Sequence, residues 1–323
     1  MRDIGQAVRV NEYGGFYRRD GAGFLFGPVG KPVAYVNTPF AHASNGAVAM
    51  CVTADMEGVR VGPGEERWGQ QFVLLAESPR QALAHWAAWV AKSHGSRIHE
   101  GALSGWNSWE FMGRQVSGTD VLAVAEAALK FPDQLRPAVI QIDAGYEDPA
   151  GMAKANDKFP EDLSFYAQRI FAAGARPGLF LDLLDKPSRT YSTAERTQHI
   201  QDIVKKGFTY LKILYRLADK AADGKRTRLE INRENYAAIR QAAGENVYLL
   251  AANSESDRAQ LGAVDACRTA ANVRTSAPGS TAYYAPIISK AGGLPLITTI
   301  ISWGPTSPTS AKSPAAGRWC EHG

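Results

Sequence analysis

The spacing of apolar residues changes near residue 79 of the chain. Before that point, short apolar or β-branched runs such as residues 24–26, 34–36 and 71–75 alternate with glycine-containing turns. The turns recur roughly every 8–12 residues, which is typical of an antiparallel sheet or sandwich. The pattern therefore predicts a β-sandwich, or the remnant of one, over residues 1–78.

A helix is predicted directly after this region. Residues 79–92 read PRQALAHWAAWVAK and contain no glycine or proline after Pro79. Proline is tolerated in the first turn of a helix because its missing N–H would have no partner there. We interpret residues 79–100 as a linker helix.

Residues 101–303 alternate between apolar runs and helical patterns. Runs typical of buried parallel strands occupy residues 103–109, 138–142, 178–184, 210–214, 247–252 and 262–266. Helical segments are predicted near residues 119–130, 161–173, 193–206 and 232–243. This alternation predicts an α/β fold with a parallel sheet, either a (β/α)8 TIM-type barrel or a doubly wound sheet.

Two further features concern this α/β region and its end. No glycine-rich GxGxxG turn follows any predicted strand, which argues against a dinucleotide-binding fold. Residues 294–302 are a candidate seventh strand, and the Pro/Ser/Thr-rich residues 304–323 are predicted to be an irregular tail.

The composition narrows the class of protein. With 45% hydrophobic and 21% charged residues, the chain is typical of a globular protein. The net charge of +4 is spread along the sequence, and its densest basic run, residues 225–228, has no interleaved aromatic residues, so we expect no nucleic-acid partner. The N-terminus lacks an apolar signal region and no run is long enough to cross a membrane, so we expect a cytoplasmic protein without a membrane partner.

The cysteines indicate neither a disulfide framework nor a metal site. Cys51, Cys267 and Cys320 are odd in number and far apart in the sequence. We therefore expect no metal and no cofactor, and the sequence leaves the oligomeric state open.

Four segments of the chain carry short motifs in a fixed order. They are GPGEE, FVLL and SPRQAL within residues 62–83, GWNSW at 105–109, IQIDAGY, NDKFP and GARPGLF within 140–180, and GFTYLKI with VDACR within 207–268. In this order they resemble glycoside hydrolase family 36, the α-galactosidase group of the melibiase clan. The resemblance covers roughly residues 55–275 and favours the barrel over the doubly wound sheet. It also implies two more β/α units and a C-terminal β-domain, so we expect an incomplete barrel in a truncated chain.

The resemblance further implies a reaction: hydrolysis of terminal α-galactosides with retention of configuration. Retaining glycosidases use two carboxylates about 5–5.5 Å apart, one as nucleophile and one as acid/base. In the family these are the aspartates of a KxD and an RxxxD motif. Here the corresponding positions hold Leu214 and Asn272, and Ala144 stands where the family has a second aspartate. Leucine has no lone pair to attack a sugar, and asparagine has no dissociable proton at neutral pH.

The residues expected to hold the sugar are retained. By resemblance, Trp106, Trp109, Asp143, Lys212 and Arg268 form a substrate site for a small α-galactoside-like carbohydrate. Aromatic faces stack on pyranose rings, and charged groups bind their hydroxyls. Each residue also has a structural alternative to a role in sugar binding. The tryptophans could be core aromatics, Asp143 could cap the next turn, and Lys212 and Arg268 could be ion-pair partners of Asp143 or Asp265.

Other acids follow the predicted strands. Asp182 and Asp185 end the third strand, while Glu255 and Asp257 follow the fifth, so all four are candidate substitutes for the missing carboxylates. Three hypotheses remain open at this point: an α-galactosidase-like hydrolase, a catalytically defective sugar-binding pseudoenzyme, and an unrelated α/β enzyme that shares these motifs.

Overall fold

A computed structural model describes most of the chain between residues 8 and 298. The described residues are 8–11, 13–17, 20–42, 48–97, 99, 103–148, 154–185, 190–215, 223–252, 258–268, 287–291 and 294–298.

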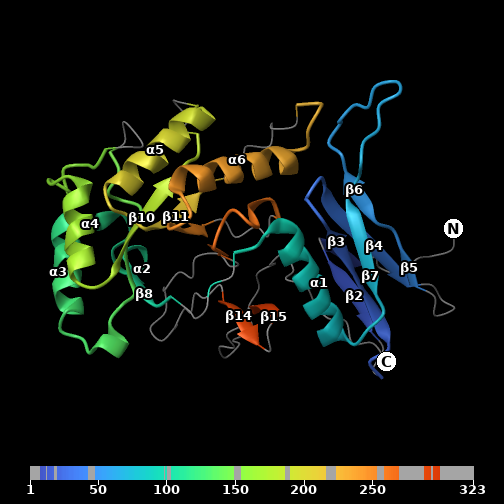
Figure 1. Cartoon of the computed structure of the whole chain (residues 1–323), viewed down its shortest axis with the longest axis horizontal. Helices are drawn as coiled ribbons and strands as arrows, with labels where there is room; N and C mark the ends of the chain where they lie inside the picture. Colours follow the sequence, from blue (N-terminus) through green and yellow to red (C-terminus); the bar gives the residue numbers. More distant parts are fainter. Residues whose placement is uncertain are drawn as a thin grey trace, which may run out of the picture.

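Two small antiparallel sheets make up the N-terminal region (Figure 1). In the first, β4 (Tyr35–His42) pairs with β1 (Val8–Asn11), β5 (Val48–Met50) and β6 (Thr53–Asp55). In the second, β3 (Gly23–Val29) lies between β2 (Gly14–Tyr17) and β7 (Gln71–Leu75).

Helix α1 (Pro79–His94) packs against the second of these sheets. It begins at a proline, as predicted, and ends at Gly95, whose φ of 61° lets the chain leave the helix in the left-handed conformation. The indole of Trp86 is buried against Leu25 and donates a hydrogen bond to the Pro28 carbonyl at 3.1 Å.

Six parallel strands follow, and they lie side by side in sequence order. The strands are β8 (Gly105–Asn107), β9 (Val139–Ile142), β10 (Arg176–Asp182), β11 (Tyr210–Leu214), β12 (Tyr248–Ala251) and β13 (Ala266–Cys267). A doubly wound sheet would reverse its strand order at a switch point, whereas sequential order is that of a (β/α) barrel. The sheet curls into part of a barrel with its helices on one face, which confirms the prediction of an incomplete barrel (Figure 1).

The helices of this region follow the strands they cover. They are α2 (Trp109–Met112), η1 (Gly113–Gln115), α3 (Gly118–Ala128), η2 (Asp133–Leu135), α4 (Leu163–Ala172), α5 (Thr193–Lys205), α6 (Arg228–Ala243) and η3 (Arg258–Gln260). Capping boxes begin α3, α5 and α6, at Ser117, Ser192 and Thr227.

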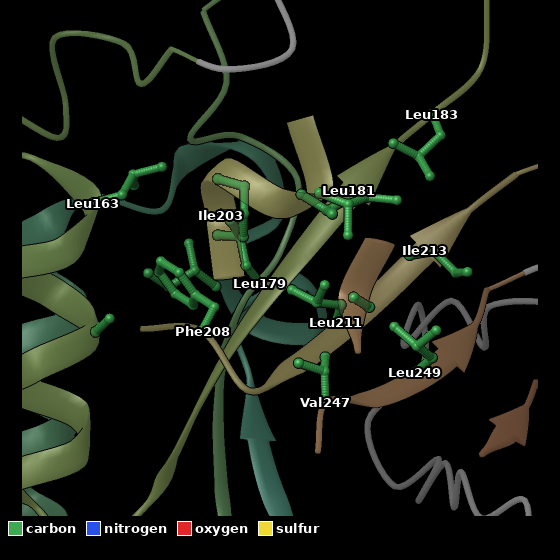
Figure 2. Packing of buried hydrophobic residues seen from close by; sticks show 14 of the residues in the cluster. Leu163, Leu179, Leu181, Leu183, Ile203, Phe208, Leu211, Ile213, Val247 and Leu249 are labelled. Carbon is green, nitrogen blue, oxygen red and sulfur yellow. The ribbon is translucent and has the colours of Figure 1, made fainter. Parts of the chain in front are cut away.

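The main core lies between the sheet and these helices. Alternate strand residues, among them Leu179, Leu181, Leu211 and Ile213, point toward the helices and are completely buried (Figure 2). Because side chains alternate along a strand, the residues between them point to the inner face of the barrel. That inner face carries the candidate site.

Four predicted strands differ in the structure. The first is shorter than residues 103–109, because Trp109 already begins α2. The third, predicted at residues 178–184, spans Arg176–Asp182, so Asp185 lies beyond its end. The last spans only Ala266–Cys267, because Gly262 lies in a turn between η3 and the strand. The candidate seventh strand is not part of the barrel: β15 (Leu294–Thr298) pairs antiparallel with β14 (Ile287–Ala291). Only Gly292 and Gly293 separate these two strands, and a two-residue connection joins antiparallel strands, not parallel ones.

Polar contacts join loops of the N-terminal region to the first turn of α6. Glu57 pairs with Arg228, Arg67 pairs with Glu230, and the Thr227 hydroxyl donates to the Val33 carbonyl. The domain boundaries at residues 78, 100 and 303 stay predictions, and the tail 304–323 lies outside the described residues.

Candidate functional site

Asp143 and Lys212 form a buried ion pair at the C-terminal ends of the barrel strands. Asp143 directly follows β9 and Lys212 lies in β11, and the lysine Nζ is 2.7 Å from Oδ2 of the carboxylate. Asp143 is 2% exposed and Lys212 is 7% exposed. Removing two charges from water is costly unless they are paired and hydrogen-bonded, so this arrangement depends on its surroundings.

Neighbouring groups fix the orientation of the Asp143 carboxylate. The Gln141 side chain donates to Oδ2 at 2.7 Å and the Ala144 backbone N–H donates to Oδ1 at 2.8 Å. The Asp143 backbone N–H donates in turn to the Ser108 hydroxyl at 2.9 Å, which joins the ends of β8 and β9. Asp143 therefore both caps the following turn and pairs with Lys212. These are the two structural interpretations made from the sequence, the turn cap and the ion-pair partner.

Leu214, the nucleophile position implied by the resemblance, lies in an apolar cluster. The cluster consists of buried Ala144, Phe180 and Ala252, with partly buried Trp109 and Leu214 packed against them. Phe180 pairs with Lys212 in the strand register, and the lysine Nζ lies 5.7 Å from the Phe180 ring centroid. The apolar cluster thus lies directly beside the ion pair.

The two tryptophans have different surroundings. Trp109 belongs to the apolar cluster at the strand ends. Trp106 is partly buried and packs against the main core between sheet and helices. Its packing agrees with the structural interpretation, that of a core aromatic.

Arg268 follows β13, where its backbone N–H donates to the Ala251 carbonyl at 2.9 Å. It therefore lies at the same end of the sheet as Asp143 and Lys212. Asn272, the acid/base position implied by the resemblance, lies outside the described residues.

Two of the four candidate substitute acids are described. Asp182 ends β10 opposite Leu214 in the strand register and accepts a hydrogen bond from the Leu184 N–H at 3.1 Å. Asp185 accepts from Arg196 of α5 at 2.5 Å and from the Tyr191 N–H, so its carboxylate is already bound near the start of α5. Asp182 is therefore the better placed of the two; Glu255 and Asp257 lie outside the described residues.

The structure adds a carboxyl group that the sequence interpretation missed. Glu110 lies in α2, and burial raises its pKa. The positive charge of Lys212 acts against this rise, Asp143 adds to it, and Arg268 also lowers it, so Glu110 is within electrostatic range of all three. Its position in the sequence could have identified it, because Glu110 directly follows the first predicted strand, at the end where barrel enzymes carry their sites.

Asp265 does not belong to this site. It precedes β13, at the opposite end of the strand from Arg268, and pairs with Arg97, His99 and Arg240. The ion-pair interpretation thus holds for Lys212 with Asp143, while Asp265 serves other cations.

The described part of the chain contains no group of three or more His, Cys, Asp or Glu residues arranged to hold a metal ion. Among its helices, none has the length and apolar character needed to cross a bilayer.

Comparison with known proteins shows the fold. The chain is similar to α-galactosidase from Thermus thermophilus in complex with p-nitrophenyl α-D-galactopyranoside (TM-score 0.60, 19% identity, 81% of this chain and 56% of that one). It is also similar to α-galactosidase from Lactobacillus brevis (TM-score 0.57, 12% identity, 83% of this chain and 45% of that one). A third similar structure is the glycoside hydrolase family 36 α-galactosidase from Geobacillus stearothermophilus (TM-score 0.53, 12% identity, 80% of this chain and 46% of that one).

The chain spans about half the length of these three structures. No known family profile matches it, and no curated protein sequence matches it either. At these identities the likeness shows a shared architecture, namely the barrel and preceding sheets of the family 36 α-galactosidases, and function must be argued from the site.

Proposed function

We propose that the chain binds a pyranose sugar at the C-terminal ends of its barrel strands and does not hydrolyse α-galactosides by the retaining route. The observation that carries this proposal is the contrast between two neighbours on β11. Lys212 is held in a buried, hydrogen-bonded pair with Asp143, whereas Leu214 packs among apolar side chains. The Thermus enzyme of similar fold binds p-nitrophenyl α-D-galactopyranoside and stachyose, which supports a carbohydrate ligand.

The chemistry of β11 explains why binding and hydrolysis separate. Retaining hydrolysis requires a carboxylate that attacks the anomeric carbon, and the Leu214 side chain has no nucleophilic atom. Asp143 and Lys212 can still exchange hydrogen bonds with sugar hydroxyls. Because these groups already satisfy one another, each new bond contributes only about 1 kcal/mol, and we expect a dissociation constant near the millimolar range.

A titration of galactose, followed by tryptophan fluorescence, tests the binding. Trp109 lies in the apolar cluster beside the ion pair, so a bound ring would change its surroundings. We expect a saturable change at millimolar galactose that Asp143→Asn and Lys212→Met each weaken at least tenfold. Lys205→Met is the matched control, because Lys205 is 71% exposed on α5. No saturation at high millimolar sugar, or a signal unaffected by both site variants, would contradict the proposal.

Hydrolysis of p-nitrophenyl α-galactoside is the second measurement. We expect the release of nitrophenol to stay at the background rate, since binding and positioning alone provide little catalysis without a nucleophile.

One observation favours a second candidate function, hydrolysis with substitute acids. Glu110 is half-buried near Lys212, Asp143 and Arg268, and its raised pKa would keep it protonated at higher pH than an ordinary glutamate, as a general acid requires. If turnover is measured, Glu110→Gln should remove it, whereas Asp185→Asn should not, because Asp185 is bound to Arg196. Turnover that survives Glu110→Gln would exclude this assignment of the acid.

A further inference from the structure

The candidate site has two chemically different halves. The polar half consists of Gln141, Asp143 and Lys212, joined by hydrogen bonds to the Asp143 carboxylate. The apolar half is the cluster described above. Its members are Ala144, Phe180, Ala252, Trp109 and Leu214.

The two halves share a boundary at the strand ends. Ala144 follows Asp143 directly, and Phe180 lies beside Lys212 in the register of β10 and β11. Leu214 is two residues beyond Lys212 on the same strand, so both side chains point to the inner face. A ligand as small as one sugar ring that contacts Asp143 or Lys212 would therefore also contact the apolar half.

Among the five side chains of the apolar half, a hydroxyl group would find few partners, while the Asp182 carboxylate lies at the edge of this half, opposite Leu214, and accepts from the Leu184 N–H. The cluster members have hydrocarbon side chains, apart from the indole N–H of Trp109. The Ala144 backbone N–H already donates to Asp143. A hydroxyl that loses water and gains no hydrogen bond is destabilised, whereas a methyl group gains from burial.

From this division we infer that the preferred ligand is a 6-deoxy sugar, a pyranose that carries a methyl group in place of the hydroxymethyl group. Its ring hydroxyls bind the Asp143 and Lys212 half, and its methyl group packs against Trp109 and Ala144. The inference rests on the proposed function, since it names the class of sugar that the same site binds. It goes further than the fold comparison, because the ligands of the Thermus enzyme are galactosides with a primary hydroxyl.

Matched sugar pairs test this directly. D-Galactose and D-fucose differ only in the hydroxyl at carbon 6, as do D-glucose and D-quinovose. We expect the 6-deoxy member of at least one pair to bind roughly 10- to 100-fold more tightly, the range seen when an apolar site discriminates a small group. The dissociation constants come from titrations of the whole chain, followed by tryptophan fluorescence and calorimetry.

The outcomes separate this inference from the proposed function. If a hydroxymethyl sugar binds as tightly as its 6-deoxy partner in every pair that binds, the inference is wrong and the binding function stands. If none of the four sugars binds, both fail.

A variant adds an independent readout. Ala144→Ser places a hydroxyl at the boundary of the two halves and should reduce the preference for the 6-deoxy sugar at least fivefold. Ala125→Ser is the matched control, since Ala125 is also buried but lies in α3, in the main core. An unchanged preference in folded Ala144→Ser would argue against contact between the methyl group and the cluster. Should Ala144→Ser fail to fold, the matched sugar pairs still decide.

Discussion

Individual side chains on the inner face of the barrel determine what its strand ends can bind. Lys212 and Leu214 differ by two positions and point the same way, yet one is held by Asp143 and the other by apolar neighbours. The pattern of alternation is set by the strand, but the chemistry at each point is set by the residue. A single residue can therefore change the chemistry of a strand end while the fold stays the same.

His199 is a residue whose burial should make stability depend on pH. It is 5% exposed within α5, and its Nδ1 has no hydrogen-bond partner among the described residues. Burial lowers the pKa of His199 from 6.5 to about 4, against an opposing effect of Asp202. The unfolded chain therefore binds this proton more readily than the folded one, so stability is complete above pH 6.5 and falls as the pH drops toward 4.

We expect His199→Gln to reduce the loss of stability in acid. The difference of roughly 2.5 pKa units corresponds to at most about 3 kcal/mol between about pH 7 and about pH 4. Urea unfolding of the protein and of His199→Gln at both pH values measures this difference in the free energy of unfolding. His85→Gln is the control, because the His85 side chain is 49% exposed. Equal acid sensitivity of the protein and His199→Gln would show that His199 is not a source of this dependence.

At the scale of elements, close contacts between a turn and a helix decide where the last described barrel strand lies. Gly262, in the turn before β13, has a φ of +83°, and a Cβ at this position would lie 2.0 Å from the His94 carbonyl oxygen at the end of α1. Any side chain here would separate the turn from the helix. The close approach holds the turn before β13 against the end of α1.

Gly262→Ala should accordingly be more destabilising than the same change at another glycine with positive φ. Gly95, after α1, has a φ of 61° and a ψ of 42°, in the left-handed region, and a Cβ there would have no heavy atom within 4 Å, so Gly95→Ala isolates the cost of the backbone conformation. We expect about 1 kcal/mol for Gly95→Ala and about 2–4 kcal/mol for Gly262→Ala, measured by urea unfolding. Equal losses would mean that the turn moves away from α1 at no cost.

At the scale of the whole molecule, Asp265 joins segments that are far apart in sequence. Its side chain is 0% exposed and binds Arg97 and His99 after α1, and Arg240 in α6. The Leu249 backbone N–H donates to it as well, at 2.7 Å. Burial alone would raise the pKa of Asp265, but these hydrogen bonds and the Arg240 charge outweigh it and lower the pKa.

Asp265→Asn should lower the free energy of unfolding by about 3–5 kcal/mol, because it leaves Arg97 and Arg240 without their buried carboxylate. Asp202→Asn is the control: the Asp202 side chain is 43% exposed beside Lys205, and an exposed pair contributes at most about 1 kcal/mol. Chemical denaturation followed by circular dichroism measures both. A loss for Asp265→Asn no larger than that of the control would rule out a central role for this carboxylate.

Much of the architecture followed from the sequence because it depends on local patterns. Strand β11 matches the predicted residues 210–214, since its alternating apolar residues face the helices. Helix α1 begins at the predicted Pro79, because the missing N–H and the fixed φ of proline suit the first position of a helix. The end of the first strand was predicted too late, because aromatic residues such as Trp109 suit a strand and a helix terminus alike.

The sequence by itself determined the order of the elements, the parallel sheet and the residue types at the strand ends, because periodicity and short motifs are properties of neighbouring residues. Only the tertiary structure decided which partners those residues have. It joined Lys212 to Asp143, surrounded Leu214 with apolar side chains from other strands, brought Glu110 near the ion pair and sent Asp265 to a different cluster. These contacts connect residues far apart in the chain, and their chemistry depends on distance and burial, which no local pattern contains.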